Sequence, residues 1–441
     1  MSVPMKDSGV EWLGKVPAHW GVFRFKQSTT LCQNGLWGGE PNGVDDIECV
    51  RVADFDRPTL RVNAEIPTLR AVSQKERVGR LLERGNLLLE KSGGGENQPV
   101  GQVVLYDRIQ QAICSNFVAK VELAPGMEPR FWNYQHHAAY AARINVQSIK
   151  QTSGIQNLDQ HQYLNEMAAF PPLEEQSAIA DHLDSATARI DALVIRKTRF
   201  IDLLREKRQA LITNAVTKGL GANVPMKDSG VEWLGHVPEH WTVARLATAF
   251  REVARAGSPE LPVLSISIHD GISDDELDET ERNRKVTHIE DRSKYKRVSP
   301  GNLAYNMMRA WQGAFGAVSV IGQVSPAYVV AEPKVPINTN YVELLLRTPM
   351  AIEEMRRFSR GIADFRSRLY WEHFRDVRVC LPPLEEQGRI VSKLAAVTSR
   401  IDILIAKTER SIELLREHRT ALITAAVTGK IDLRNDLRNA A

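Results

Sequence analysis

The sequence predicts an α+β protein in which two mixed α/β domains are separated by two long helices. The helices are expected to pack as an antiparallel coiled coil, with internal pseudo-twofold symmetry. Three observations predict this arrangement: segments that recur in the same order in both halves, a long helical pattern that closes each half, and short strand-like apolar runs between them. A chain of 441 residues is also too long for one ordinary core, since domains commonly span about 100–200 residues.

The recurring segments are long enough to exclude chance. Residues 3–20 read VPMKDSGVEWLGKVPAHW, and residues 224–241 match them at sixteen of eighteen positions. The hexapeptide PPLEEQ begins at Pro171 and again at Pro382, and LLREKRQALITNAVT at residues 203–217 returns at 414–428 with twelve of fifteen positions identical. This spacing is far wider than the 20–50 residues of a solenoid repeat, so it indicates duplication of a whole domain.

The regions between the repeats are unlike each other. Residues 21–169 and 242–380 have similar lengths but little identity. One frame holding two dissimilar inserts indicates one kind of task performed on two different targets.

A long helix is predicted after each PPLEEQ. Two prolines pre-set an extended entry, and the paired glutamates place negative charge at the helix N-terminus. Apolar residues then follow a four-three spacing, the pattern of a coiled-coil seam. The predicted seam comprises Ile179, Leu183, Ile190, Leu193, Leu204, Leu211, Ile390, Leu394, Ile401, Leu404, Leu415 and Leu422.

Because no small domain could bury a rod of roughly 66 Å, the two helices are expected to pack on each other. The alternative is that each packs on its own domain. The predicted division is a first domain over 1–170, a first long helix over 171–222, a second domain over 223–381 and a second long helix over 382–441.

The inserts share an order of elements. In the first, strands are predicted over 85–90, 100–106 and 117–123, followed by a helix over 128–144. In the second, strands over 301–306, 316–321 and 327–331 precede a helix over 339–358. A polar loop follows the first of these strands in each insert.

Both loops carry side chains suited to DNA. Amide side chains can read adenine edges, and arginine can bind guanine through two hydrogen bonds. Alternatively, each of these residues could serve a structural turn or contact phosphate. The candidate DNA-binding residues are Lys91, Ser92, Gly93, Gly94, Asn97, Gln98, Gln151, Thr152, Arg309, Trp311, Gln312, Arg366 and Arg368. Seven basic residues against three acidic ones over 281–297 add a positive patch, which could equally be a solvated surface.

Catalytic motifs are not found. The loop SGGGENQPVG lacks the GxxxxGK[ST] spacing of a P-loop, and no GxGxxG opens a helix after a strand. His136, His137 and His161 lack partners at metal-ligand spacing, so no metal is expected. FPPL at residues 170–173 lacks the asparagine and the aromatic of an amino-methyltransferase motif. We therefore expect no catalysis by this chain.

The composition excludes some classes of protein but does not indicate a function. The net charge of +3 neither requires nor excludes nucleic acid, and the four cysteines are too scattered to suggest a zinc site or disulfides. No apolar run reaches the roughly 18–20 residues of a membrane span, and residues 1–15 lack the apolar core of a signal peptide. These features predict a cytoplasmic protein.

The repeated pieces resemble the specificity subunits of type I restriction–modification enzymes over essentially the whole chain. The resemblance rests on MKDSGVEWLG at residues 5 and 226, PPLEEQ, and LLRExRxALITxAVT; NLAYNMMRAWQGAFG at 302 and GIADFRSRL at 361 also look like that family. It implies two target-recognition domains, each reading one half of a split asymmetric site in double-stranded DNA, with the helices fixing the gap.

The resemblance also implies partners. Two methyltransferase subunits would dock on the repeated regions, with restriction/translocase subunits outside them, and no membrane would be involved. S-adenosylmethionine, ATP and magnesium would be bound by those partners, and no cofactor by this chain. Two other functions stay open from the residues alone: a non-enzymatic scaffold presenting two protein-binding modules, and an enzyme with unfamiliar motifs.

Overall fold

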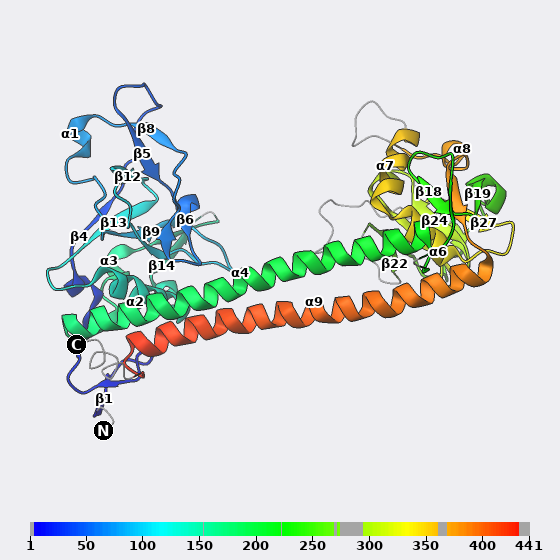
Figure 1. Cartoon of the computed structure of the whole chain (residues 1–441). Coiled ribbons are helices and arrows are strands. Elements are labelled where there is room, and N and C mark those ends of the chain that lie inside the picture. The colour runs from blue at the N-terminus through cyan, green and yellow to red at the C-terminus, as the bar shows by residue number, and fades with distance from the viewer. Residues whose placement is uncertain are drawn as a thin grey trace. The chain divides into compact units, whose positions relative to one another are not determined.

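The protein forms two compact units, each of which combines one insert with part of both long helices. The first unit is Met1–Lys197 with Arg410–Ala441, and the second is Thr198–Glu409. The computed structural model describes residues 4–152, 154–221, 223–268, 271–273, 294–359 and 368–431 (Figure 1). The predicted four-part division, which sets the helices apart from the domains, therefore differs from these units and stays a prediction.

The first unit is built on a six-stranded sheet in the order β4-β13-β9-β11-β7-β6. The central strand β9 is fully buried and antiparallel to both neighbours. The strands are β4 (Thr29–Asn34), β6 (Phe55–Asp56), β7 (Arg61–Val62), β9 (Leu87–Glu90), β11 (Val103–Leu105) and β13 (Val118–Leu123). Two smaller three-stranded sheets join β12 (Ala112–Cys114), β5 (Asp46–Val50) and β8 (Leu69–Ala71), and β10 (Ser92–Gly93), β15 (Ile155–Leu158) and β14 (Ile149–Thr152).

The second unit repeats the centre of this sheet. Its four strands follow the order β20-β27-β24-β25, which corresponds to β4-β13-β9-β11. They are β20 (Phe250–Glu252), β24 (Leu303–Asn306), β25 (Phe315–Ala317) and β27 (Tyr328–Pro333). Two-stranded sheets pair β21 (Ser265–Ser267) with β22 (Gly271–Ser273) and β23 (Lys296–Val298) with β26 (Gly322–Val324). The duplication seen in the frame therefore extends to the fold of the dissimilar inserts.

Helices cover the sheets in both units. In the first unit α2 (Pro129–Ala141) buries Phe131 and Trp132 in the core. In the second unit α6 (Thr339–Leu346) packs Val342 and Leu345 in the same way. The shorter helices are η1 (Phe25–Ser28), η2 (Val52–Asp54), α1 (Gln74–Arg77), η3 (Ile144–Ser148), α3 (Gln160–Tyr163), α5 (Leu246–Ala249), η6 (Ala310–Gln312), α7 (Pro349–Phe358) and α8 (Trp371–Phe374).

The repeated N-terminal segments fold identically. In each, a short antiparallel pair encloses the loop SGVEWLG, with Met5 opposite Pro17 in the first copy and Met226 opposite Pro238 in the second. The pairs are β1 (Met5–Asp7) with β2 (Lys15–Pro17), and β17 (Met226–Asp228) with β18 (His236–Pro238). One further pair closes each insert: β3 (Gly21–Arg24) with β16 (Met167–Phe170) in the first, and β19 (Thr242–Arg245) with β28 (Arg378–Leu381) in the second.

The two long helices are confirmed as α4 (Leu173–Lys218) and α9 (Leu384–Val427). A glutamine in the first turn ties each one to its domain. The Gln176 carboxamide oxygen accepts a hydrogen bond from the Glu128 backbone N–H at 3.0 Å, and that of Gln387 accepts one from Asn338 at 2.8 Å. Both glutamines are buried, so these bonds fix where each helix leaves its insert.

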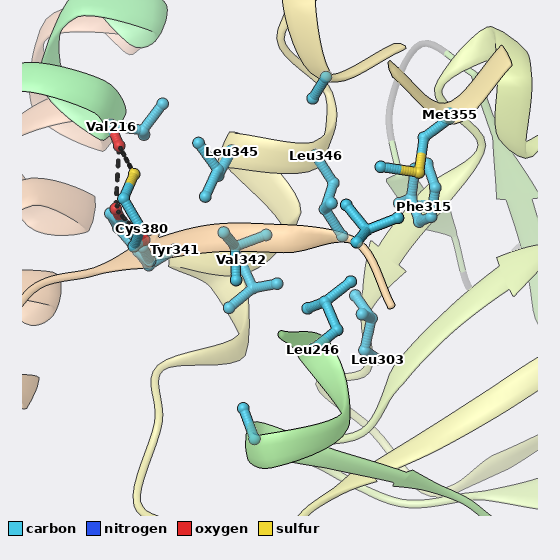
Figure 2. Packing of buried hydrophobic residues seen from close by; sticks show 14 of the residues in the cluster. Val216, Leu246, Leu303, Phe315, Tyr341, Val342, Leu345, Leu346, Met355 and Cys380 are labelled. Carbon is cyan, nitrogen blue, oxygen red and sulfur yellow. Dashed lines mark hydrogen bonds between the residues drawn. The ribbon is translucent and has the colours of Figure 1, made fainter. Parts of the chain in front are cut away.

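The core of each unit contains the start of one long helix and the end of the other. The start of α4 (Ile179, Leu183) and the end of α9 (Ile423, Val427) lie in the first core. The end of α4 and the start of α9 lie in the second. Figure 2 shows this second core, where Val342, Leu345 and Leu346 of α6 pack with Leu246, Leu303, Phe315 and Met355.

Within each unit, the segments of α4 and α9 lie side by side and run in opposite directions (Figure 1). In the first unit, Arg419 lies 3.1 Å from Asp191; in the second, Arg208 lies 3.0 Å from Asp402. The two pairs occupy equivalent positions of the duplicated sequence. The predicted antiparallel packing is therefore confirmed in each unit, together with packing of the helix ends on the domains.

The seam deviates from a strict heptad. Leu193 and Leu404, expected on it, are 44% and 45% exposed, so this part of the prediction is wrong. An α-helix turns once every 3.6 residues, and a 3.5-residue pattern drifts off its face. The other predicted seam residues are buried or partly buried. The buried ones are Ile179, Leu183, Ile190, Leu204, Ile390, Leu394 and Ile401, and the partly buried ones are Leu211, Leu415 and Leu422. The drift also places in buried positions five residues outside the predicted seam: Thr187, Ile201, Ile212, Thr408 and Ile412.

The predicted helix over 339–358 is wrong as a single element. It breaks into α6 and α7 because Pro349 begins a new helix whose first turn is capped by Thr348. Its hydroxyl accepts a hydrogen bond from the Ala351 N–H at 3.3 Å. The helix predicted over 128–144 ends at Ala141, followed by Arg143 in the left-handed conformation at φ 58°. In the described part of the chain, no helix is long and apolar enough to cross a membrane.

The Arg419–Asp191 pair should contribute to the stability of the first unit. Replacing Arg419 with Ala leaves a partly buried carboxylate without its cation, so we expect the free energy of unfolding to fall by about 1–2 kcal/mol. The measurement is urea denaturation of the full chain. Arg410→Ala, which removes an exposed cation from the same helix, is the control and should leave the transition unchanged. Equal losses in both variants would contradict a specific role for the pair.

Candidate nucleic-acid interface

The glycine-rich loop of the first insert is held by a hairpin distant in sequence. Ser92–Gly93 forms β10 and pairs with β15, which pairs in turn with β14. The Leu158 N–H donates to the Lys91 carbonyl at 2.9 Å, and the Ser92 hydroxyl is hydrogen-bonded to Asn157. The loop is therefore part of a small sheet that projects from the end of β9.

Glycine is required where the loop reverses. Gly94 has φ +67°, and a Cβ there would lie 2.5 Å from the Val100 nitrogen. The Val100 N–H donates to the Gln156 side-chain oxygen at 3.1 Å, which fixes the return of the chain. Asn97 and Gln98 are exposed on the reversal, where their amides are free to meet a ligand.

Charged groups at the base of this loop have hydrogen-bond partners within the domain. Glu90, fully buried at the end of β9, accepts hydrogen bonds from Arg57 at 3.0 Å on both oxygens. Burial raises the pKa of Glu90, against the opposing effect of Arg57. Lys91 donates to the Asn34 side chain at 2.6 Å, and partial burial lowers its pKa. The loop therefore presents mainly amides and backbone groups rather than free cations.

The second insert has an equivalent loop of different chemistry. Residues 307–313 follow β24, and Gly313 closes the turn at φ +92°. The Leu369 N–H donates to the Met307 carbonyl at 2.9 Å, which brings the segment beginning at Arg368 beside the loop. Arg309, Gln312 and Arg368 are exposed.

Trp311 is less available than the sequence suggested. Its indole N–H donates to the Met308 carbonyl at 2.9 Å, and the Arg356 guanidinium lies 5.5 Å from its ring centroid. The ring is only partly exposed. We therefore assign Trp311 to the support of the loop rather than to insertion into a ligand.

The structure thus groups the candidates into one surface per unit. Eight lie on the loop and hairpin of the first unit: Lys91, Ser92, Gly93, Gly94, Asn97, Gln98, Gln151 and Thr152, of which the Thr152 side chain lies outside the described residues. Four lie on the second surface: Arg309, Trp311, Gln312 and Arg368. Arg366 and most of the basic stretch 281–297 lie outside the described residues.

Sequence reasoning missed the turn before β13. Asn116 and Phe117 are exposed there, and the Phe117 carbonyl accepts a hydrogen bond from Lys91 at 2.8 Å. No local motif marks this turn as a neighbour of the loop, because the contact depends on the sheet order β13-β9. The only local signal of this turn in the sequence was the polar pair Ser115–Asn116, which separates two apolar runs.

The histidines of α2 are structural. His136 is buried, stacks on Phe25 with ring centroids 4.4 Å apart, and shares a 2.8 Å hydrogen bond with the Tyr163 hydroxyl. Burial lowers the pKa of His136 to about 3. Among the described residues, no group of three His, Cys, Asp or Glu side chains could hold a metal ion.

Comparison with known proteins identifies related chains. No protein-family model matches the sequence. A putative type I restriction enzyme MjaX specificity subunit from Methanocaldococcus jannaschii is 21% identical over 446 residues, which cover 96% of both chains. The type I restriction enzyme EcoBI specificity subunit from Escherichia coli is 20% identical over 345 residues, covering 73% of this chain and 70% of its own. The chain is thus similar to type I restriction enzyme specificity subunits over most or nearly all of its length.

Solved structures share the fold of this chain. A chain from a study of complex assembly and conformational transition of the type I R-M system gives a TM-score of 0.67 at 14% identity, covering 94% of this chain and 99% of its own. The HsdS subunit from Thermoanaerobacter tengcongensis gives 0.53 at 14% identity, covering 94% and 98%.

Burial of His136 predicts that the first unit loses stability in mild acid. The unfolded chain takes up a proton on this histidine below about pH 6.5, whereas the folded domain does so only near pH 3, so stability falls as the pH is lowered through this range. His136→Gln should reduce the difference in unfolding free energy between pH 7 and pH 5 by about 2 kcal/mol. Denaturant titrations at both pH values measure this, and an unchanged difference would show that the folded domain accepts the protonated ring.

Proposed function

We propose that the chain is the sequence-specific DNA-binding subunit of a type I restriction–modification complex. Each unit reads one half of a bipartite, asymmetric site in double-stranded DNA. The observation that carries this proposal is that one scaffold occurs twice and presents two unlike loops at the same place. The first offers the amides Asn97 and Gln98, and the second offers Arg309, Gln312 and Arg368.

The difference in loop chemistry supports different targets. Amide side chains pair well with adenine edges and arginine with guanine edges, each good pair discriminating by about 1–3 kcal/mol. Both loops are braced by backbone hydrogen bonds to neighbouring segments, which limits the entropy lost on binding. Two such readers on one chain specify two different half-sites.

We further propose that two copies of a methyltransferase subunit dock on the repeated regions. Equivalent apolar side chains of the two helices are exposed to the same degree: Leu173 and Leu384 at 49% each, and Leu203 and Leu414 at 46% and 50%. Large apolar groups left in solvent at matched positions suit one partner bound twice. Restriction/translocase subunits would then bind outside this core.

Catalysis is assigned to these partners. We place S-adenosylmethionine, ATP and magnesium on the partner subunits, because this sequence lacks both the GxxxxGK[ST] and the GxGxxG patterns. The chain itself contributes specificity, and the helices α4 and α9 contribute the spacing between half-sites.

Replacing residues 21–169 with a second copy of 242–380 tests the reading of half-sites. The variant should direct methylation to two inverted copies of one half-site, which genome-wide mapping of methylated positions with the partner methyltransferase will reveal. A protein-binding scaffold predicts no change of motif, and a change in both half-sites of the natural site would contradict independent reading.

Removing one heptad from both helices tests the spacing role. Deleting 194–200 and 405–411 preserves the Arg419–Asp191 and Arg208–Asp402 pairs and shortens each helix by about 10.5 Å, while keeping the proposed docking residues Leu203 and Leu414. We expect the preferred gap to shrink by about three base pairs, at 3.4 Å each, with both half-sites unchanged. The same methylation mapping measures the gap, and an unaltered gap would refute the spacing role.

A further inference from the structure

An exposed aromatic side chain stands beside the recognition loop of the first unit. Phe117 is 54% exposed, more than Phe23 at 47%, whereas Phe25, Phe55 and Phe131 of the same unit are buried. It occupies the turn between β12 and β13, at the end of the sheet from which the loop 91–99 projects, since Val118 pairs with Glu90. The phenyl group therefore lies next to the amides that we assign to DNA reading.

The turn that carries Phe117 is firmly held. The Ser115 N–H donates to Val50 at 2.9 Å, and the Val118 N–H closes the turn on Ser115 at 3.0 Å. The Phe117 carbonyl accepts hydrogen bonds from the backbone N–H groups of Lys91 at 2.8 Å and Ser92 at 3.3 Å. These hydrogen bonds fix the backbone of the turn to the loop, whereas the ring stays in solvent. The ring can therefore contact a bound ligand with little loss of backbone entropy.

The second unit provides a counterpart from a different position. Its equivalent turn ends in Ala327, whose carbonyl accepts the Met307 N–H at 3.2 Å. Alanine is too small to project, but Met308, the next residue of the loop, is 45% exposed. Trp311 is bound to Met308 and Arg356 and is not free to project. Each loop therefore has one large apolar side chain at its surface.

We propose that Phe117 and Met308 are apolar wedges that each unstack one base-pair step of their half-site. Phenylalanine and methionine are among the side chains that DNA-bending proteins insert between base pairs. Such insertion favours easily deformed steps, so it adds specificity at positions that no hydrogen bond reads. This inference rests on the DNA-binding function proposed above.

The test uses the complete chain with its methyltransferase partner and DNA carrying the site found by methylation mapping. The fluorescent base 2-aminopurine is placed in turn at each position of both half-sites except the methylated adenines, so that any extrusion of the target base does not contribute. On binding, the wild-type chain should raise the fluorescence at one step in each half-site.

The variants separate the two wedges. Phe117→Ala should abolish the rise in the first half-site only and weaken binding roughly ten- to hundredfold, and Phe117→Trp should restore both. Met308→Ala should do the same in the second half-site. Ile109→Ala is the matched control: its side chain is 88% exposed, but it lies on the turn after β11, at the opposite end of the sheet. It should change neither signal.

Four results would overturn the inference. Weaker binding by Phe117→Ala with the fluorescence rise intact would assign the ring to sugar or phosphate packing. Loss of methyltransferase binding with normal DNA binding would assign it to partner docking. Binding of wild type without any rise would exclude unstacking while leaving the proposed function intact, whereas absence of site-specific binding by the wild-type complex would refute both.

Discussion

Burial of the helix ends is the interaction on which the rest of the structure depends. Each domain core is completed by the start of one long helix and the end of the other. The last turns are held by polar contacts as well: in the second core the Tyr341 hydroxyl donates to the Val216 carbonyl at 2.9 Å and to that of Cys380 at 3.0 Å (Figure 2). In the first core the Gln135 carboxamide, oriented to satisfy both its polar atoms, donates to the equivalent Val427 carbonyl at 3.1 Å. The carbonyls that a helix leaves unpaired at its end are thus used to anchor it.

This constraint separates what must stay constant from what can vary. The repeated sequence supplies the contacts of the frame, such as Gln176 and Gln387 at the helix entries. Sheet order is also kept, while the hydrogen bonds described for the loops after β9 and β24 join them to segments of their own inserts. A loop can therefore change its side chains without loss of the helix anchors, which is the arrangement that a protein with changeable specificity requires.

The sequence predicted the features that arise from local pattern. Proline pairs, glutamates and apolar spacing predicted both ends of α4 and the start of α9 to within a few residues, whereas α9 ends at Val427, well before the predicted bound at residue 441. The glycine-rich segment predicted the first loop. Features set by distant contacts were missed. The seam register at Leu193 and Leu404 depends on helix drift accumulated over several turns, the support of Trp311 by Arg356 joins two helices, and the exposure of Phe117 depends on how β13 pairs with β9. The break at Pro349 was readable from the sequence, but the apolar pattern on both sides of it favoured one helix.

The contribution of α9 to the first core has a consequence for biosynthesis. Ile423, Ala426 and Val427 are buried with Leu13 and Trp20, residues that are synthesised long before them. The second core needs only the end of α4, which is already synthesised, and the first turns of α9. Of the two domains, the one that leaves the ribosome first is therefore the last to acquire its complete core, and its apolar surface stays uncovered until the end of α9 has emerged.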